Sequence, residues 1–171
     1  MPDDDLCPLN PSLRKVECAH CQGPPSGTSE NPIFSMEEGF FNGFPVVEVL
    51  KNGGPVHPWD THWCFGQRKA EILVTCLPVL REFWQAEDAE RLAFATRIIE
   101  NERHSLKIQV YVEMHPDFEH STGQRIDRPW LHLRALPPDT GDIGLGAIKC
   151  RAVCAVEHDL RAWLRKLGIP E

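Results

Sequence analysis

Four cysteines near the two ends of the sequence have the spacing of metal ligands. Cys18 and Cys21 are separated by two residues and followed by Gly23, and this spacing lets both thiolates reach one tetrahedral ion from a tight turn. No second Cys-x-x-Cys is present, so the other ligands must come from elsewhere. Cys150 and Cys154 lie four residues apart in an apolar-periodic segment, which places both sulfurs on one face of a helix. The sequence therefore predicts a structural zinc site made by Cys18, Cys21, Cys150 and Cys154.

This zinc site would hold down the first 32 residues, which are rich in proline and show neither helical nor strand periodicity. We expect residues 1–32 to form an irregular arm. Ordering a backbone costs about 1–2 kcal/mol per residue, and the arm has few large apolar side chains to offset that cost by burial. A zinc site contributing on the order of 10 kcal/mol would be sufficient.

The cysteines also fit other interpretations. Cys7 or His20 could replace one of the four ligands, or the cysteines could be ordinary reduced thiols in a loop and a helix core. A redox pair is disfavoured, because Pro24 and Pro25 prevent a helix from starting directly after Cys21.

A second group of reactive side chains lies in Gly-Pro-Val-His-Pro-Trp-Asp-Thr-His-Trp-Cys, residues 54–64. We interpret Asp60 as the N-cap of a long helix. A helix N-terminus lowers the pKa of a thiol, so Cys64 could be a nucleophile. His57 would be its base, since residues two apart on a helix, such as His62 and Cys64, do not face each other.

A third group, His115, Asp117 and His120, lies in the segment 113–120. Imidazoles and carboxylates could bind a metal or transfer protons there, particularly if the segment lies near His57 and His62. The alternative is a solvated surface loop.

Composition limits the class of protein. The chain has 171 residues, 42% hydrophobic residues and a net charge of −7, which is typical of one globular domain rather than a membrane protein. The negative charge disfavours binding to nucleic acids. The N-terminus does not resemble a secretory signal, so we expect a cytoplasmic location, where the seven cysteines are reduced rather than paired.

Periodicity predicts the elements that position these residues. Short strands at 33–36 and 44–50 flank a turn at 39–43. Apolar residues from Phe65 to Trp84 follow a helical period, interrupted by Pro78, where we expect a kink or break. A second helix is predicted over 88–102 with Asp88 as its cap.

From residue 106 onward, apolar side chains recur at every second position. Residues 106–114 and 131–135 alternate apolar and polar side chains, so we expect two antiparallel strands. A last helical stripe runs from Ile148 to Leu167 and ends at Gly168. The fold class is therefore α+β: one small antiparallel sheet packed against two to three helices in a single domain, 33–171, with the arm stapled to it.

Two functions remain open, because the common enzyme motifs are absent from the sequence. The first is a zinc-stapled protein-binding or adaptor module without catalytic activity. Its candidate anchors are the aromatic residues Phe40, Phe41, Trp59, Trp63 and Trp130. The second is a metal- or Cys-dependent hydrolase. Its candidate residues are His57, His62, Cys64, His115, Asp117 and His120.

Zinc analysis tests the cysteine site. We expect the double substitution Cys18→Ser/Cys21→Ser to lower the zinc content by one ion per chain, because two of four ligands are lost. Equal zinc content in the variant and the wild type would contradict the staple.

Overall fold

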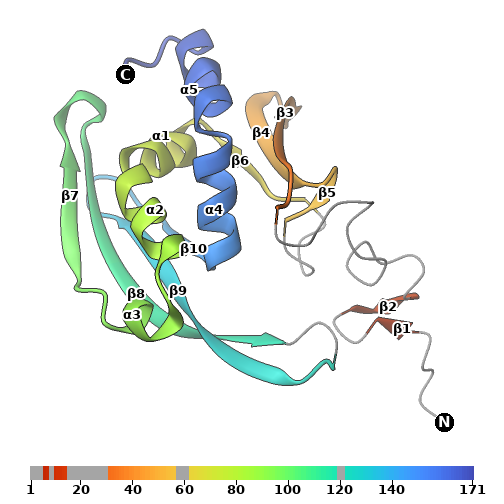
Figure 1. Cartoon of the computed structure of the whole chain (residues 1–171). Coiled ribbons are helices and arrows are strands. Elements are labelled where there is room, and N and C mark those ends of the chain that lie inside the picture. Colours follow the sequence, from red (N-terminus) through yellow and green to blue (C-terminus); the bar gives the residue numbers. More distant parts are fainter. Residues whose placement is uncertain (1–5, 8–9, 15–30, 57–61, 119–121) are drawn as a thin grey trace.

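The protein places a layer of helices between two antiparallel sheets (Figure 1). The computed structural model describes residues 6–7, 10–14, 31–56, 62–118 and 122–171. Within this part of the chain there are two four-stranded sheets, one two-stranded sheet and five α-helices. The α+β class is confirmed, but the prediction of one sheet and two to three helices is wrong.

The first sheet is built on the predicted hairpin. Strands β3 (Phe34–Phe41) and β4 (Phe44–Lys51) pair in an antiparallel register. Asn42 and Gly43 both have positive φ angles, 50° and 80°, as a tight two-residue turn between twisted strands requires. Two short strands, β5 (Gly54–Pro55) and β6 (Cys64–Gly66), also pair with β4.

The predicted long helix is two helices, α1 (Gln67–Thr75) and α2 (Leu77–Gln85). The break falls at Cys76, as Pro78 predicts, because proline is tolerated only in the first turn of a new helix. The predicted N-cap is wrong: α1 is capped by Gly66, whereas Asp60 lies outside the described residues. The start is later because Cys64–Gly66 pairs with β4 as a strand.

The predicted helix over 88–102 is wrong beyond its first turn. Helix α3 covers only Asp88–Leu92, its N-cap is Glu87 rather than Asp88, and β7 covers Arg97–Asn101. Ile98 of β7 is 54% exposed. The β-branched residues of this segment fit a helical period, but pairing along β8 satisfies the backbone of the whole segment and decides its structure.

The second sheet has the strand order β10-β9-β8-β7. Its long central strands are β8 (Leu106–Phe118) and β9 (Arg125–Ala135), and β10 (Asp142–Leu145) pairs with β9. The predicted antiparallel pairing of 106–114 with 131–135 is confirmed. Ile108, Val110, Leu131 and Leu133 point into the core and are completely buried.

The last helical stripe is also divided, into α4 (Ala147–Ala155) and α5 (Glu157–Lys166). The prediction of one continuous helix is wrong, since α4 packs against α2 whereas α5 packs against α1. The predicted stop is confirmed, because Gly168 has a φ of 79°, a left-handed conformation that glycine adopts without strain.

The first residues are partly regular. Strands β1 (Leu6–Cys7) and β2 (Asn10–Arg14) form a two-stranded antiparallel sheet in the segment predicted to be irregular. None of the helices formed by the described residues is both long enough and apolar enough to cross a bilayer.

The core gives a direct test of this arrangement. Leu133→Ala should lower the free energy of unfolding by about 2–5 kcal/mol, because it leaves a cavity under the helices. Leu92→Ala, at a position that is 55% exposed, should change it by about 0.5 kcal/mol or less. Urea unfolding measures both values, and equal losses in the two variants would contradict the described burial.

Candidate metal centre

The outer face of the second sheet, which points away from the helices, gathers the polar groups of three strands. Side chains alternate between the two faces of a strand. Since Ile108 and Val110 of β8 and Leu131 and Leu133 of β9 point into the core, the residues that alternate with them share the outer face. These are Tyr111, Glu113 and His115 of β8 with Trp130, His132 and Arg134 of β9, and Asp142 of β10 lies beside them.

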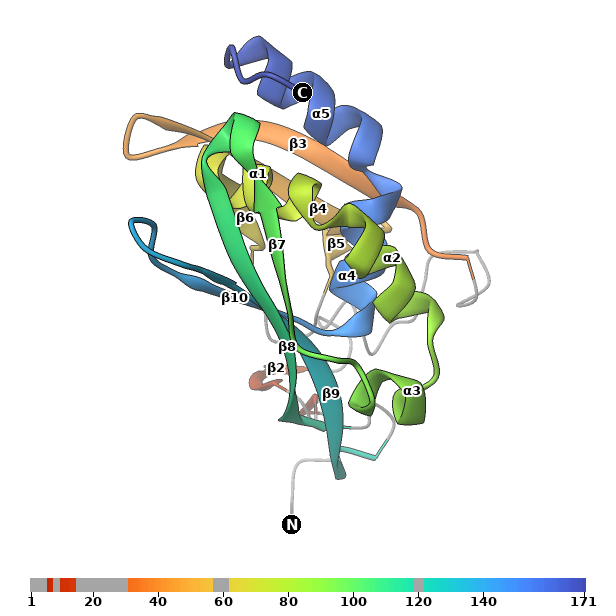
Figure 2. The same ribbon diagram turned by 90° about the vertical axis from the view of Figure 1, so that its left-hand side faces the viewer.

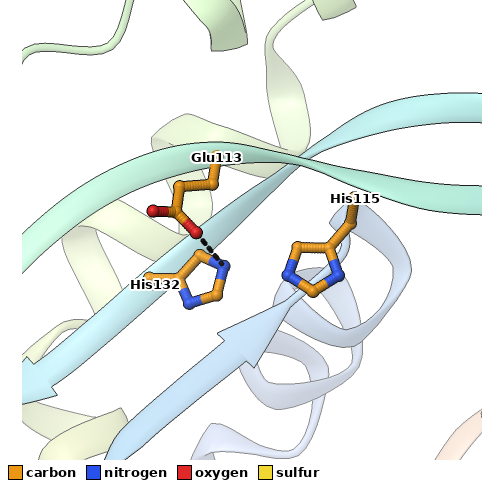
Figure 3. A group of neighbouring side chains, drawn as sticks. All are labelled: Glu113, His115 and His132. Carbon is orange, nitrogen blue, oxygen red and sulfur yellow. Dashed lines mark ion pairs between the residues drawn. The ribbon is translucent and has the colours of Figure 1, made fainter.

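Three of these side chains form a group that could hold one metal ion. One ligand atom each from Glu113, His115 and His132 lies within 4.8 Å of the others. Figure 3 shows Glu113 and His115 reaching from β8 toward the imidazole of His132 on β9. Among the described residues, no other set of three His, Cys, Asp or Glu side chains is grouped in this way.

His132 is the most constrained member of the group. Its residue exposure is only 8%, and its Nδ1 lies 2.9 Å from Oδ1 of Asp142. An ionised carboxylate only accepts hydrogen bonds, so Nδ1 donates and the lone pair of the neutral ring is on Nε2. Asp142 therefore fixes which ring nitrogen is available to a ligand.

Among the described residues, no group forms a hydrogen bond with Nε2 of His132. Oε2 of Glu113 lies 3.9 Å away, which is too far for a hydrogen bond. Leaving a buried polar atom unpaired costs about 1–3 kcal/mol. A cation between Nε2, the Glu113 carboxylate and His115 would satisfy all three groups.

Asp142 is itself held by hydrogen bonds. The Tyr111 hydroxyl donates to Oδ2 of Asp142 over 2.5 Å, and Nη2 of Arg134 lies 3.4 Å from the same oxygen. Burial raises the pKa of Asp142, but hydrogen bonds from Tyr111 and His132 and the nearby positive charge outweigh it, so the pKa lies below its usual value. Asp142 is thus an anion that orients His132, the arrangement seen around many metal-bound histidines.

Stacked rings fix the positions of the two imidazoles. His115 stacks on Trp130 at 4.3 Å between ring centroids and on His132 at 5.2 Å, and Tyr111 stacks on the other side of His132 at 5.0 Å. Cζ of Arg134 then lies 4.8 Å from the Tyr111 ring centre. Residues from β8 and β9 alternate through this stack, so the strand register sets the distance between the imidazoles.

Glycines leave room for the stack. A Cβ atom at Gly144, which pairs with His132 across the strands, would lie 3.2 Å from Cε1 of the imidazole. A Cβ atom at Gly146 would lie 3.3 Å from Nε1 of Trp130. Larger residues at either position would push the rings out of place.

The donor set suits a transition metal. Two imidazoles and one carboxylate are ligands that zinc accepts in catalytic sites, where a fourth position stays open. A zinc ion lies about 2 Å from each ligand atom, so these side chains would have to move toward one another by about 1 Å. The Glu113 side chain is 60% exposed and has room to move.

The structure places the predicted site residues in different regions. His115 belongs to the metal group, and Asp117 follows on β8, where Oδ2 lies 3.8 Å from Nε of Arg128. His62 and Cys64 belong to the first sheet, across the helical layer, and His62 bonds to Glu48 at 2.7 Å. His57 and His120 lie outside the described residues.

The environment of Cys64 differs from the expected one. Cys64 is exposed in strand β6 rather than in the first turn of a helix. Burial of the sulfur and the charge of Glu48 raise the pKa of the Cys64 thiol, opposite to the direction predicted for a helix N-terminus. The structure thus gives no support for a Cys64 thiolate at neutral pH.

The cysteine staple stays a prediction. Cys150 is completely buried in α4 and Cys154 is partly buried. Burial is the main cause that raises the pKa of both thiols. Their proposed partners Cys18 and Cys21, and the alternative ligand His20, lie outside the described residues.

Sequence reasoning missed His132 and Asp142 as site residues, and it included Glu113 only as part of the segment 113–120. The alternation in Trp-Leu-His-Leu-Arg does place His132 on the outer face, and the segment containing His115 was singled out. What the sequence lacked was the register, which pairs Tyr111 with His132.

Comparison of the chain with protein-family models, curated proteins and solved structures finds no match. The site must therefore be interpreted from its own chemistry.

The lowered pKa of Asp142 predicts a pH-dependent contribution to stability. Its folded pKa is below the unfolded value of about 3.9, so the charged form stabilises the fold above that pH, and this contribution is lost as the pH falls through the folded pKa. Asp142→Asn should cost about 1 kcal/mol at pH 7 and much less near pH 3. Urea unfolding at both pH values measures this, with the surface variant Asp127→Asn as control, and a loss independent of pH would contradict the assignment.

Proposed function

We propose that the protein is a metal-dependent hydrolase that binds one zinc ion through Glu113, His115 and His132. The observation that carries the proposal is the buried Nε2 of His132, which faces two further ligand groups and has no hydrogen-bond partner in the part of the chain that the structure describes. Asp142 supports it, because it holds the His132 ring in the tautomer that a metal requires.

The arrangement favours catalysis over a structural role. Structural zinc sites are closed by four protein ligands, whereas three ligands leave a position for water or substrate. Zinc bound in this way lowers the pKa of a coordinated water to about 7, which permits hydrolysis near neutral pH. In the proposed reaction the oxygen of water bonds to the carbonyl carbon of an ester or amide, and the leaving group departs with a proton.

The residues around the ion have separate roles. Glu113 and the two imidazoles hold the ion, Asp142 accepts the hydrogen bond from Nδ1 of His132, and Tyr111 and Arg134 hold Asp142. Trp130 packs against His115 and limits rotation of its ring.

Zinc titration tests this proposal. It is best performed on chelator-treated protein carrying Cys18→Ser/Cys21→Ser, so that the predicted cysteine site has lost two of its four ligands. We expect one zinc ion to bind per chain, and Glu113→Gln to weaken its binding about 100-fold or more, since loss of even an indirect supporting group costs about 10–100-fold. Glu113 is exposed, so this change leaves the core intact.

Glu100→Gln is the matched control, because Glu100 is a similarly exposed residue of the same sheet. Zinc binding to the Cys18→Ser/Cys21→Ser protein that survives Glu113→Gln, His115→Ala and His132→Ala would contradict the proposed site. Ester hydrolysis that a chelator leaves unchanged would contradict the proposed reaction.

A second candidate function is binding of a protein partner, and the exposure of three phenylalanines favours it. Phe40, Phe41 and Phe44 are 80%, 68% and 72% exposed at the tip of the β3–β4 hairpin, which projects from the body (Figure 2). Exposed aromatic clusters are common anchors in interfaces. Of the other predicted anchors, Trp63 and Trp130 are partly buried, and Trp59 lies outside the described residues.

The triple variant Phe40→Ser/Phe41→Ser/Phe44→Ser tests this second candidate. Because these side chains contribute little to the core, we expect an unchanged melting temperature and loss of the proteins co-purified by affinity capture. Ile98→Ser, at an exposed position of the other sheet, is the control. Identical captured proteins in the wild type and the triple variant would contradict this role.

A further inference from the structure

We propose that the substrate of this site carries an anionic group, which Arg134 binds, a short distance from the bond that is hydrolysed. This inference rests on the proposed zinc hydrolase and adds its substrate class: an ester or amide with a carboxylate or phosphate at one end.

The first observation is that Arg134 has free hydrogen-bond donors. Its Nη2 donates to the Tyr111 hydroxyl over 2.6 Å and lies 3.4 Å from Asp142. Within the described part of the chain its Nε and Nη1 have no partner, and its side chain is 51% exposed. Nε and Nη1 lie on different edges of the guanidinium, so each can donate a separate hydrogen bond to an oxygen of a carboxylate or phosphate.

The second observation is the position of Arg134 relative to the ion-binding group. Arg134, His132 and Trp130 lie on the same face of β9. The Tyr111 ring separates the guanidinium from the imidazole, at 4.8 Å from Cζ of Arg134 and 5.0 Å from the His132 ring centre. The distance from Cζ of Arg134 to the centre of the His132 ring is therefore at most the sum of these two distances.

A short molecule can span this separation, with its reacting carbonyl at the ion and its anionic end at Arg134. A zinc ion lies about 2 Å from its ligands, and an oxyanion lies about 2.8 Å from an arginine N–H, so a linker of about two to four carbon atoms would join the reacting carbonyl to the anion.

Charge supports the same substrate class. With a divalent ion bound, the charges of the ion and Arg134 exceed those of Glu113 and Asp142, so the face is locally positive although the whole chain carries −7. A neutral substrate would leave this excess unbalanced, whereas an anionic one would neutralise it.

Hydroxamate probes test this inference without measuring activity, because a hydroxamate binds zinc directly. The probes are butyrohydroxamate, which is neutral, the monohydroxamates of succinate and glutarate, which add a carboxylate, and 3-phosphonopropanohydroxamate, which adds a phosphonate. Calorimetry on zinc-saturated protein gives their affinities. We expect the best anionic probe to bind about tenfold tighter than the neutral one, and the comparison of carboxylate with phosphonate identifies the preferred anion.

The matched variants are Arg134→Gln and Arg125→Gln. Arg125 is an exposed arginine of the same strand that pairs with Asp127. Because Arg134 also holds Asp142, the readout is the ratio of the anionic to the neutral affinity within each variant. Arg134→Gln should reduce this ratio to about twofold or less, and Arg125→Gln should preserve it. If Arg134→Gln also abolishes binding of the neutral probe, Arg134→Lys is the deciding variant. It keeps the positive charge and should retain part of the preference for anionic probes.

The outcomes separate the two proposals. Equal affinities for neutral and anionic probes in the wild type, or an advantage that survives both Arg134 variants, would overturn the role of Arg134 alone. Absence of zinc-dependent hydroxamate binding in the wild type would overturn the hydrolase itself.

Discussion

The antiparallel pairing of β8 with β9 is the constraint on which the rest of the structure depends. Its register places Tyr111 directly opposite His132, and a shift by one residue would turn every side chain of one strand to the opposite face. Such a shift of β8 would move Ile108 and Val110 out of the core and His115 into it. The apolar core beneath the sheet therefore fixes the positions of the polar groups above it.

The same register explains why an unpaired buried nitrogen persists on the outer face. His132 is enclosed by stacked rings on both sides, and its Nδ1 is committed to Asp142. Its Nε2 cannot reach water easily and cannot rotate toward another donor without breaking that bond. In native proteins such atoms are uncommon and point to a missing ligand or ion, and the neighbouring carboxylate and second imidazole indicate a cation.

Local patterns predicted the elements with strong signals, and tertiary pairing decided the others. Pro78 and the Asn42-Gly43 pair located a helix break and a turn correctly because each restricts the backbone directly, although β3 continues to Phe41, past the predicted end of its strand. The segment after Leu92 could not be predicted, because its apolar spacing fits a helix until β8 is available as a partner. Strand β10 is too short to show a period of its own.

The site was only partly predictable for the same reason. His115 lies in a segment rich in imidazoles and carboxylates, which drew attention to it. His132 and Asp142 lie 17 and 27 residues further along the chain, and only the strand pairing brings them beside it. No local motif records such a site, since its geometry comes from three strands rather than from one loop.

Anomalous X-ray scattering from a zinc-loaded crystal is the most direct test of the central claim. The account predicts a zinc peak about 2 Å from Nε2 of His132, with His115 and Glu113 as further ligands and Asp142 still bonded to Nδ1. A fully occupied zinc ion elsewhere, with Nε2 of His132 hydrogen-bonded to a water or to a protein group, would contradict it.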